Sequence, residues 1–196
     1  MKKIIILFIL LLASPLHAFG PAIQAVVSVC GVAAPSCTLY QSSTGLGDTN
    51  PIGSYRRYVG QKNFTVASPK EVCQLVFYVS STVGNISAKT YYAEIWNQSG
   101  DNLGTLVAGG TCQITKSGAD ITTGWNTFTG FSCPLLSTGT YAMTISTHNA
   151  LDSSNYAVAG AQSSSSGMTG YLAVWTNLDL YDQSGAEEAG LEVYFK

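Results

Sequence analysis

The sequence predicts an all-β protein, an antiparallel two-sheet β-sandwich of jelly-roll-like type. Alternating apolar and polar residues recur in short segments, and glycine, serine, asparagine and aspartate separate these segments. No segment shows a sustained apolar period of 3.6 residues, so no helix is expected. Many short strands that each have one apolar face bury that face when two sheets pack on each other.

Four segments show the alternation most clearly: residues 72–80, 90–96, 139–147 and 190–196. Because successive side chains of a strand point to opposite faces, one set in each segment is expected to face the core. The set consists of Leu75, Phe77, Val79, Ala93, Ile95, Tyr141, Met143, Ile145, Leu191, Val193 and Phe195. Shorter strands are expected at residues 58–66, 105–108, 125–131, 156–159 and 171–175.

The N-terminus has the pattern of a secretory signal peptide. Lys2 and Lys3 precede an apolar run over residues 4–12, and Pro15 and the small residue Ala18 follow. Cleavage is expected after Ala18. The run is shorter than the ~20 residues that a membrane-spanning helix needs, so no membrane insertion is expected after cleavage.

We therefore expect a secreted protein, extracellular or periplasmic, with three parts. Residues 1–18 are the signal peptide, residues 19–50 an extra N-terminal strand or a stalk, and residues 51–196 the β-sandwich. Removal of the two signal lysines leaves 7 of 9 basic residues against 11 acidic ones, a net charge of −4. This charge gives no electrostatic reason to bind nucleic acid.

Five cysteines follow the signal peptide, and an exported chain can keep disulfides. Cys112 and Cys133 are expected to pair, because they bracket two short strands around a Ser-Gly-Ala-Asp turn. Cys30 and Cys37 would close a small loop. Cys73 is in register with the inward side chains of its strand and is expected to be a free, buried thiol. No cysteine has histidine at zinc-ligand spacing.

The strand at residues 90–96 contains the main candidate binding site. If Ala93 and Ile95 point inward, then Tyr92, Glu94 and Trp96 stand together on the opposite face. Two aromatic rings and one acceptor on a solvent face are suited to stack on a sugar ring and to accept bonds from its hydroxyls.

Two further tyrosines, Tyr78 and Tyr194, occupy outward positions on their own strands and would extend the aromatic surface. The alternative is that other segments cover this face and bury the rings. Glu94 would then pair with a neighbour such as Arg56 or Arg57.

The sequence also contains residue types that catalytic or metal-binding sites use. His148, Asp152 and nearby serines contain the residue types of a hydrolase triad but no G-x-S-x-G elbow. A glycoside hydrolase would need two facing carboxylates, and Glu94 with Glu192 is the candidate pair. Acidic residues in the segment 177–190 could offer oxygen ligands to Ca²⁺, although their spacing matches no calcium loop. No cofactor and no catalytic residue are therefore expected.

From about Tyr58 onward the sequence resembles the choice-of-anchor β-sandwich domains of secreted bacterial proteins. The phrases that carry the resemblance are "VGQKNFTV", "VCQLVFYVS", "YAEIWNQSGDNLGT", "GWNTFTGFSCPLLSTGTYAMTIS" and "LEVYFK". The resemblance covers residues 58–196 and implies a β-sandwich without an established activity. No sorting signal follows Lys196, so release or incorporation into an assembly is expected over surface attachment.

Two classes of function follow from these observations. The first is a noncatalytic module that binds a glycan or a cell-surface protein. The second is a structural protein of an exported assembly, such as a virion or an appendage, that associates with itself or with other exported proteins. Exposed rings beside polar groups would favour the first, and a broad apolar face would favour the second.

Overall fold

The computed structural model describes residues 36–42, 48–54, 57–100, 102–110, 112–133, 135–163, 171–174, 180–181 and 187–196. The chain divides into two units, Met1–Ser36 and Cys37–Lys196, and the fold below is that of the second. The predicted signal peptide and Cys30 lie outside the described residues. No helix in the described ranges has the length and apolar character of a membrane span.

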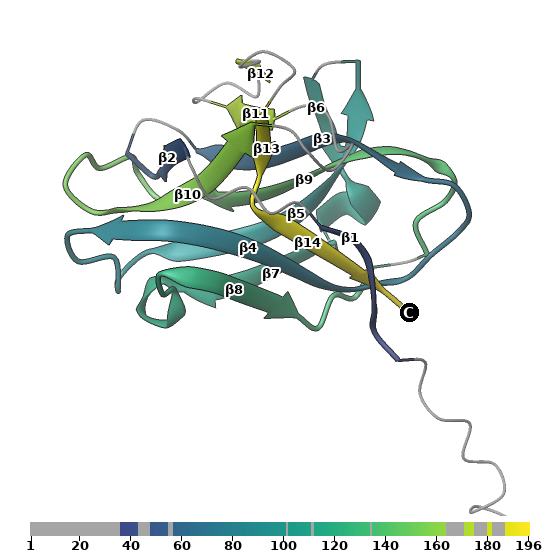
Figure 1. The fold of residues 1–196 in the computed structure, drawn as a ribbon, viewed down its shortest axis with the longest axis horizontal. Coiled ribbons are helices and arrows are strands. Elements are labelled where there is room, and N and C mark those ends of the chain that lie inside the picture. The colour runs from purple at the N-terminus through teal and green to yellow at the C-terminus, as the bar shows by residue number, and fades with distance from the viewer. Residues whose placement is uncertain are drawn as a thin grey trace, which may run out of the picture. The chain divides into compact units, whose positions relative to one another are not determined.

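The first sheet contains seven strands, and all of its pairings are antiparallel (Figure 1). Its central strand β4 pairs with β8 on one edge, and with β14 and then β10 on the other. The seven strands are β1 (Thr38–Ser42), β2 (Asp48–Ile52), β4 (Val72–Val83), β8 (Gly124–Thr129), β10 (Tyr156–Ser163), β13 (Glu187–Ala189) and β14 (Leu191–Phe195).

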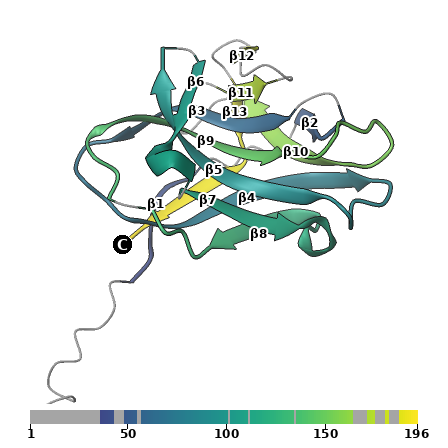
Figure 2. The same cartoon turned by 180° about the vertical axis from the view of Figure 1, so that it is seen from behind.

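The second sheet also contains seven antiparallel strands, which Figure 2 shows from the other side. β9 lies between β3 and β5, and β5 pairs on its other edge with β6 and β7. The strands are β3 (Tyr58–Val66), β5 (Thr90–Ser99), β6 (Asn102–Leu106), β7 (Gln113–Ser117), β9 (Gly139–Thr147), β11 (Tyr171–Val174) and β12 (Leu180–Tyr181). Two short 3-10 turns, η1 (Val107–Gly110) and η2 (Gly118–Asp120), follow β6 and β7.

The inner faces of the two sheets form one apolar core. All eleven side chains predicted to face the core are buried in it, from Leu75 on β4 to Phe195 on β14. Antiparallel pairing keeps the alternation of neighbouring strands in phase, so each strand contributes its apolar set to the same layer. The prediction of an all-β sandwich with two antiparallel sheets is confirmed.

Two strands come from the segment expected to be an extra strand or a stalk. β1 pairs with β14 and β2 pairs with β10, both in the first sheet. Residues 38–42 and 48–52 therefore belong to the sandwich unit, which begins at Cys37.

The disulfide between Cys112 and Cys133 is present as predicted, with a Cα–Cα distance of 4.7 Å. The two short strands expected around the Ser-Gly-Ala-Asp turn are β7 and β8, but they do not pair with each other as a hairpin. β7 pairs with β5 in the second sheet, whereas β8 pairs with β4 in the first. The chain crosses from one sheet to the other through η2, and the disulfide joins the two sheets at this edge.

The prediction for Cys73 is wrong, and so is the proposed bond between Cys30 and Cys37. Cys73 forms a disulfide with Cys37, 36 residues away. The cause is a β-bulge: Gln74 opposes Tyr194 and Val72 opposes Phe195, so Cys73 is the extra residue of β4. The bulge shifts the alternation by one residue, which buries Val72 in the core and leaves Cys73 only half-buried.

Both disulfides should contribute to stability, because they restrict the unfolded chain. The chain segments that they close are 21 and 36 residues long, for which loop-closure entropy corresponds to about 3 and about 4 kcal/mol. We expect the double substitution Cys112→Ser with Cys133→Ser to lower the free energy of unfolding by about 3 kcal/mol, and the Cys37 and Cys73 pair by slightly more. Urea unfolding checks both values, and a variant as stable as the wild type would contradict the assigned pair.

Candidate functional site

Tyr92, Glu94 and Trp96 share the outer face of β5, as the alternation predicts. The face is nevertheless covered at two of the three positions: Glu94 is 0% exposed and Trp96 is 6% exposed. Tyr92 is half-buried and stacks on the imidazole of His148, with ring centroids 4.0 Å apart. At these positions other segments cover the outer face of β5, as in the alternative prediction, and the prediction of an exposed sugar-binding surface is wrong.

The carboxylate of Glu94 is surrounded by four donors. Gln113 Nε2 lies 2.6 Å and His148 Nε2 3.0 Å from Oε1. Ser146 Oγ donates to Oε2 at 2.6 Å, and the longer contact of Thr144 Oγ1 with Oε2 is 3.4 Å. A carboxylate offers about four acceptor positions, so this one has none left for a ligand hydroxyl.

Burial determines the electrostatics of Glu94. Loss of solvent raises the pKa of this carboxyl, and the hydrogen bond from Ser146 together with the nearby His148 acts in the opposite direction. The partner of Glu94 is thus His148, rather than the Arg56 or Arg57 that the sequence offered. Arg56 lies outside the described residues.

Trp96 belongs to a small apolar cluster outside the main core, with Tyr58, Leu103 and Ala142. The ring of Tyr58 meets the indole edge-to-face at 5.6 Å. The indole N–H donates to Thr144 Oγ1 at 3.0 Å, and Thr144 contacts Glu94 in turn. Trp96 is a packed structural side chain, and its ring is not available to stack on a ligand.

The groups considered for catalysis do not come together. His148 faces Glu94, whereas Asp152 accepts hydrogen bonds from Ser154 N and Asn155 Nδ2 and lies beside Lys89. Glu192 stands on β14 in the first sheet and Glu94 on β5 in the second. The two carboxylates therefore do not flank one cleft.

A polar row on β9 and the residue after it closes this face and was not predicted from the sequence. Thr144, Ser146 and His148 follow the same alternation as the inward residues Met143 and Ile145, but on the opposite face. The signal was therefore present as hydroxyl and imidazole side chains at every outward position from 144 to 148. Their target could not be identified because the pairing of β5 with β9 spans about fifty residues.

Tyr78 and Tyr194 lie on the outer face of the first sheet, so they do not extend the surface of β5. Tyr78 instead pairs across β4 and β8 with Trp125, and the two rings meet edge-to-face at 5.2 Å. Trp125 is 41% exposed. On β14, Tyr194 Oη donates to Glu192 Oε2 at 2.8 Å, and this bond raises the pKa of Tyr194.

We call Trp125, Tyr78, Thr127, Thr129, Glu192 and Tyr194 the aromatic platform. The side chains lie in three rows that run across β8, β4 and β14. Trp125 and Tyr78 form the first row, Thr127 and Glu192 the second, and Thr129 and Tyr194 the third. The outer rows are four residues apart on β4, about 13 Å at the rise of a strand. The platform is therefore an elongated surface.

The orientation of Trp125 is set by the turn that precedes β8. The buried amide of Asn126 accepts from Thr122 N and donates to the carbonyls of Thr122 and Gly124. Gly124 adopts φ 106°, a conformation that side chains disfavour. With Asn126 and Phe128 buried, the alternation of β8 directs Trp125, Thr127 and Thr129 to solvent. The alternation in "GWNTFT" therefore contains the signal that predicts an exposed Trp125.

The calcium hypothesis concerned the acidic segment at 177–190, which lies largely outside the described residues. Within the described ranges no three metal-ligating side chains form a group.

Comparisons with known proteins give no further identification. No protein-family model and no curated protein matches this chain. The resemblance to choice-of-anchor domains therefore stays a prediction from the sequence phrases.

Trp96 and Trp125, which both lie on outer faces of described strands, should differ sharply in their contribution to stability. We expect Trp96→Ala to lower the free energy of unfolding by about 3–5 kcal/mol, because a buried indole leaves a cavity. We expect Trp125→Ala, the matched exposed change, to cost less than about 1 kcal/mol. Urea unfolding of both variants measures the difference, and equal losses would show that Trp125 is also covered.

The stability of the protein should depend on pH through Glu94. Because burial raises the pKa of Glu94, the folded protein holds this proton more tightly than the unfolded chain. The stabilisation is fully present below the ordinary value of 4.5 and is lost as the pH rises through the folded pKa. Glu94→Gln should remove this decline in the free energy of unfolding.

Urea unfolding at a series of pH values above 4.5 measures this slope. Glu71→Gln, which changes a solvent-accessible carboxyl beside Lys196, is the control. An unchanged slope in Glu94→Gln would contradict the assignment.

Proposed function

We propose that this protein is a secreted, noncatalytic β-sandwich module that binds a glycan chain on the aromatic platform of its first sheet. The observation that carries the proposal is the exposed indole of Trp125, held against Tyr78 on the outer face of that sheet.

An exposed indole leaves a large apolar area in water. Trp125 presents a large apolar ring to solvent, and its edge-to-face contact with Tyr78 restricts its orientation. Stacking of a flat ligand on the exposed ring removes this area from water at little entropic cost, because the side chain is already ordered. The faces of sugar rings carry the C–H groups suited to such stacking.

Polar groups on the platform support a sugar over a purely apolar ligand. The exposed hydroxyls of Thr127 and Thr129 follow Trp125 along β8. Glu192 accepts from Tyr194 and retains further acceptor positions. The donors and acceptors of the platform are spread over about 13 Å along the strands, and an oligosaccharide presents hydroxyls at intervals along such a length. A chain of several sugar units is therefore the expected ligand.

The absence of catalysis is part of the proposal. Glycoside hydrolysis requires two carboxyl groups on either side of one bond. Glu94, the partner considered for Glu192, stands on the other sheet and already receives four donors.

Export is also proposed, and it has two independent supports. Two disulfides join cysteines of the sandwich unit, as in proteins that fold under oxidising conditions. The first eighteen residues have the sequence pattern of a signal peptide.

Assembly with copies of this chain or with a surface protein is the second candidate function. β1 stands at one end of the strand order of the first sheet, and Leu39 on it is 47% exposed. An edge strand with exposed apolar residues is suited to pair with another chain.

A glycan array probed with the purified mature protein tests the proposed function, followed by calorimetric titration of the best-bound oligosaccharide. Trp125→Ala should weaken binding by about 1–3 kcal/mol and leave the melting temperature nearly unchanged. Leu135→Ala, which removes another exposed apolar side chain, is the matched control and should bind as the wild type does.

An array without binding, or full affinity in Trp125→Ala, would refute the proposal. Sedimentation velocity on the wild type and on Leu39→Lys tests the second function. A wild-type oligomer that dissociates in Leu39→Lys would favour assembly.

A further inference from the structure

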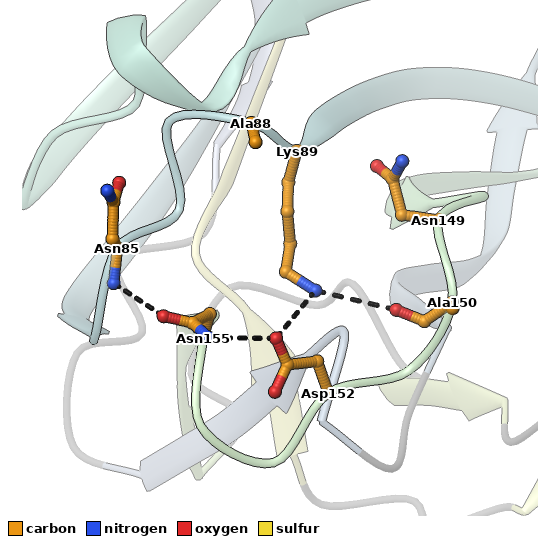
Figure 3. Close-up of a pocket in the computed structure, with 7 residues that line it drawn as sticks. All are labelled: Asn85, Ala88, Lys89, Asn149, Ala150, Asp152 and Asn155. Atoms are coloured by element: carbon orange, nitrogen blue, oxygen red, sulfur yellow. Dashed lines mark hydrogen bonds and ion pairs between the residues drawn. The ribbon is translucent and has the colours of Figure 1, made fainter.

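A polar pocket lies at one end of the sandwich, apart from the aromatic platform. It is formed between the loop that joins β4 to β5 and the loop that joins β9 to β10, and its volume is about 400 Å³ (Figure 3). Small-molecule sites commonly measure ~300–1,000 Å³. The lining residues are Asn85, Ala88, Lys89, Asn149, Ala150, Asp152 and Asn155.

Direct bonds between the two loops keep the pocket formed. Asn155 Oδ1 accepts from Asn85 N, and Asn149 Oδ1 accepts from Thr90 N, both at 2.7 Å. Gly84 adopts φ 64°, and a Cβ atom there would collide with the carbonyl of Ser154 in the other loop. A ligand that enters this pocket therefore does not need to order the loops first.

The side chain of Lys89 is unusually buried for a lysine, with 10% of its surface exposed. Its ammonium has two long contacts, 3.4 Å to Ala150 O and 3.6 Å to Asp152 Oδ2 (Figure 3). An ammonium group has three donors, and hydrogen bonds to oxygen are normally near 2.9 Å. Lys89 thus keeps donor capacity inside the pocket.

Asp152 supplies the complementary acceptor. The hydrogen bond from Asn155 and that from Ser154 N lower the pKa of this carboxyl, so it is ionised at neutral pH. Lys89 and Asp152 together have no net charge. A pair of this kind favours a neutral ligand with adjacent hydroxyls, one accepting from the ammonium and one donating to the carboxylate.

We propose that this pocket is a second binding site, which takes a single neutral sugar residue through vicinal hydroxyls held by Lys89 and Asp152. The pocket is bounded by two loops, whereas the platform extends across three strands. The proposal does not depend on binding at the platform, because no residue is shared between the two sites.

Two-dimensional ¹H–¹⁵N NMR of the mature protein tests the proposal, with glucose, galactose, mannose and N-acetylglucosamine as separate probes. At least one sugar should shift the amide signals of residues 85–89 and 149–155 in a saturable way. Lys89→Met keeps the aliphatic stem and removes the ammonium, and it should weaken binding about tenfold or more, as expected for a charged hydrogen bond.

Lys116→Met is the matched control, because Lys116 donates to Thr127 O elsewhere on the molecule. It should retain the wild-type affinity. If Lys89→Met does not fold, Asp152→Asn replaces it with the same expectation. Acetate serves as an anionic comparison probe. The proposal would be overturned by the absence of shifts with all four sugars, by shifts confined to Trp125 and its neighbours, or by shifts with acetate but with none of the sugars.

Discussion

The pairing of β9 with both β3 and β5 determines the organisation of the second sheet. On its inner side β9 contributes Met143 and Ile145 to the core, and on its outer side it presents Thr144 and Ser146 to Glu94. β3 approaches β9 so closely at Gly60 that a Cβ atom there would overlap the carbonyl of Met143. The register of this pairing cannot slip by one residue, because hydroxyls would enter the core and apolar groups would face the carboxylate.

Periodicity of two residues was sufficient to predict the fold class and the inward face of each long strand, because burial of apolar area acts on every strand separately. It was insufficient to predict a bulge or a pairing partner, because these depend on a second strand. The bulge at Cys73 arises from the match of β4 to β14, and the separation of β7 from β8 arises from their different partners.

The candidate site shows the same limit. The outward direction of Glu94 and Trp96 followed from their own strand, but their burial depends on β9 and on the cluster around Tyr58. The same alternation also predicts the outward direction of Trp125, because the buried Asn126 and Phe128 fix which residues of β8 face inward. What distinguishes Trp125 from Trp96 is the number of neighbours over the ring, which a single sequence does not contain.

Folding order is constrained by the position of the last strand. β14 pairs with both β1 and β4, so the final residues of the chain join strands from its first half. Contacts of such long sequence separation form slowly, and the first sheet cannot be completed during synthesis until residue 195 has left the ribosome. Until residues 191–195 are available, β1 and β4 lack the strand that pairs with both of them, so the first half of the chain cannot complete its own sheet.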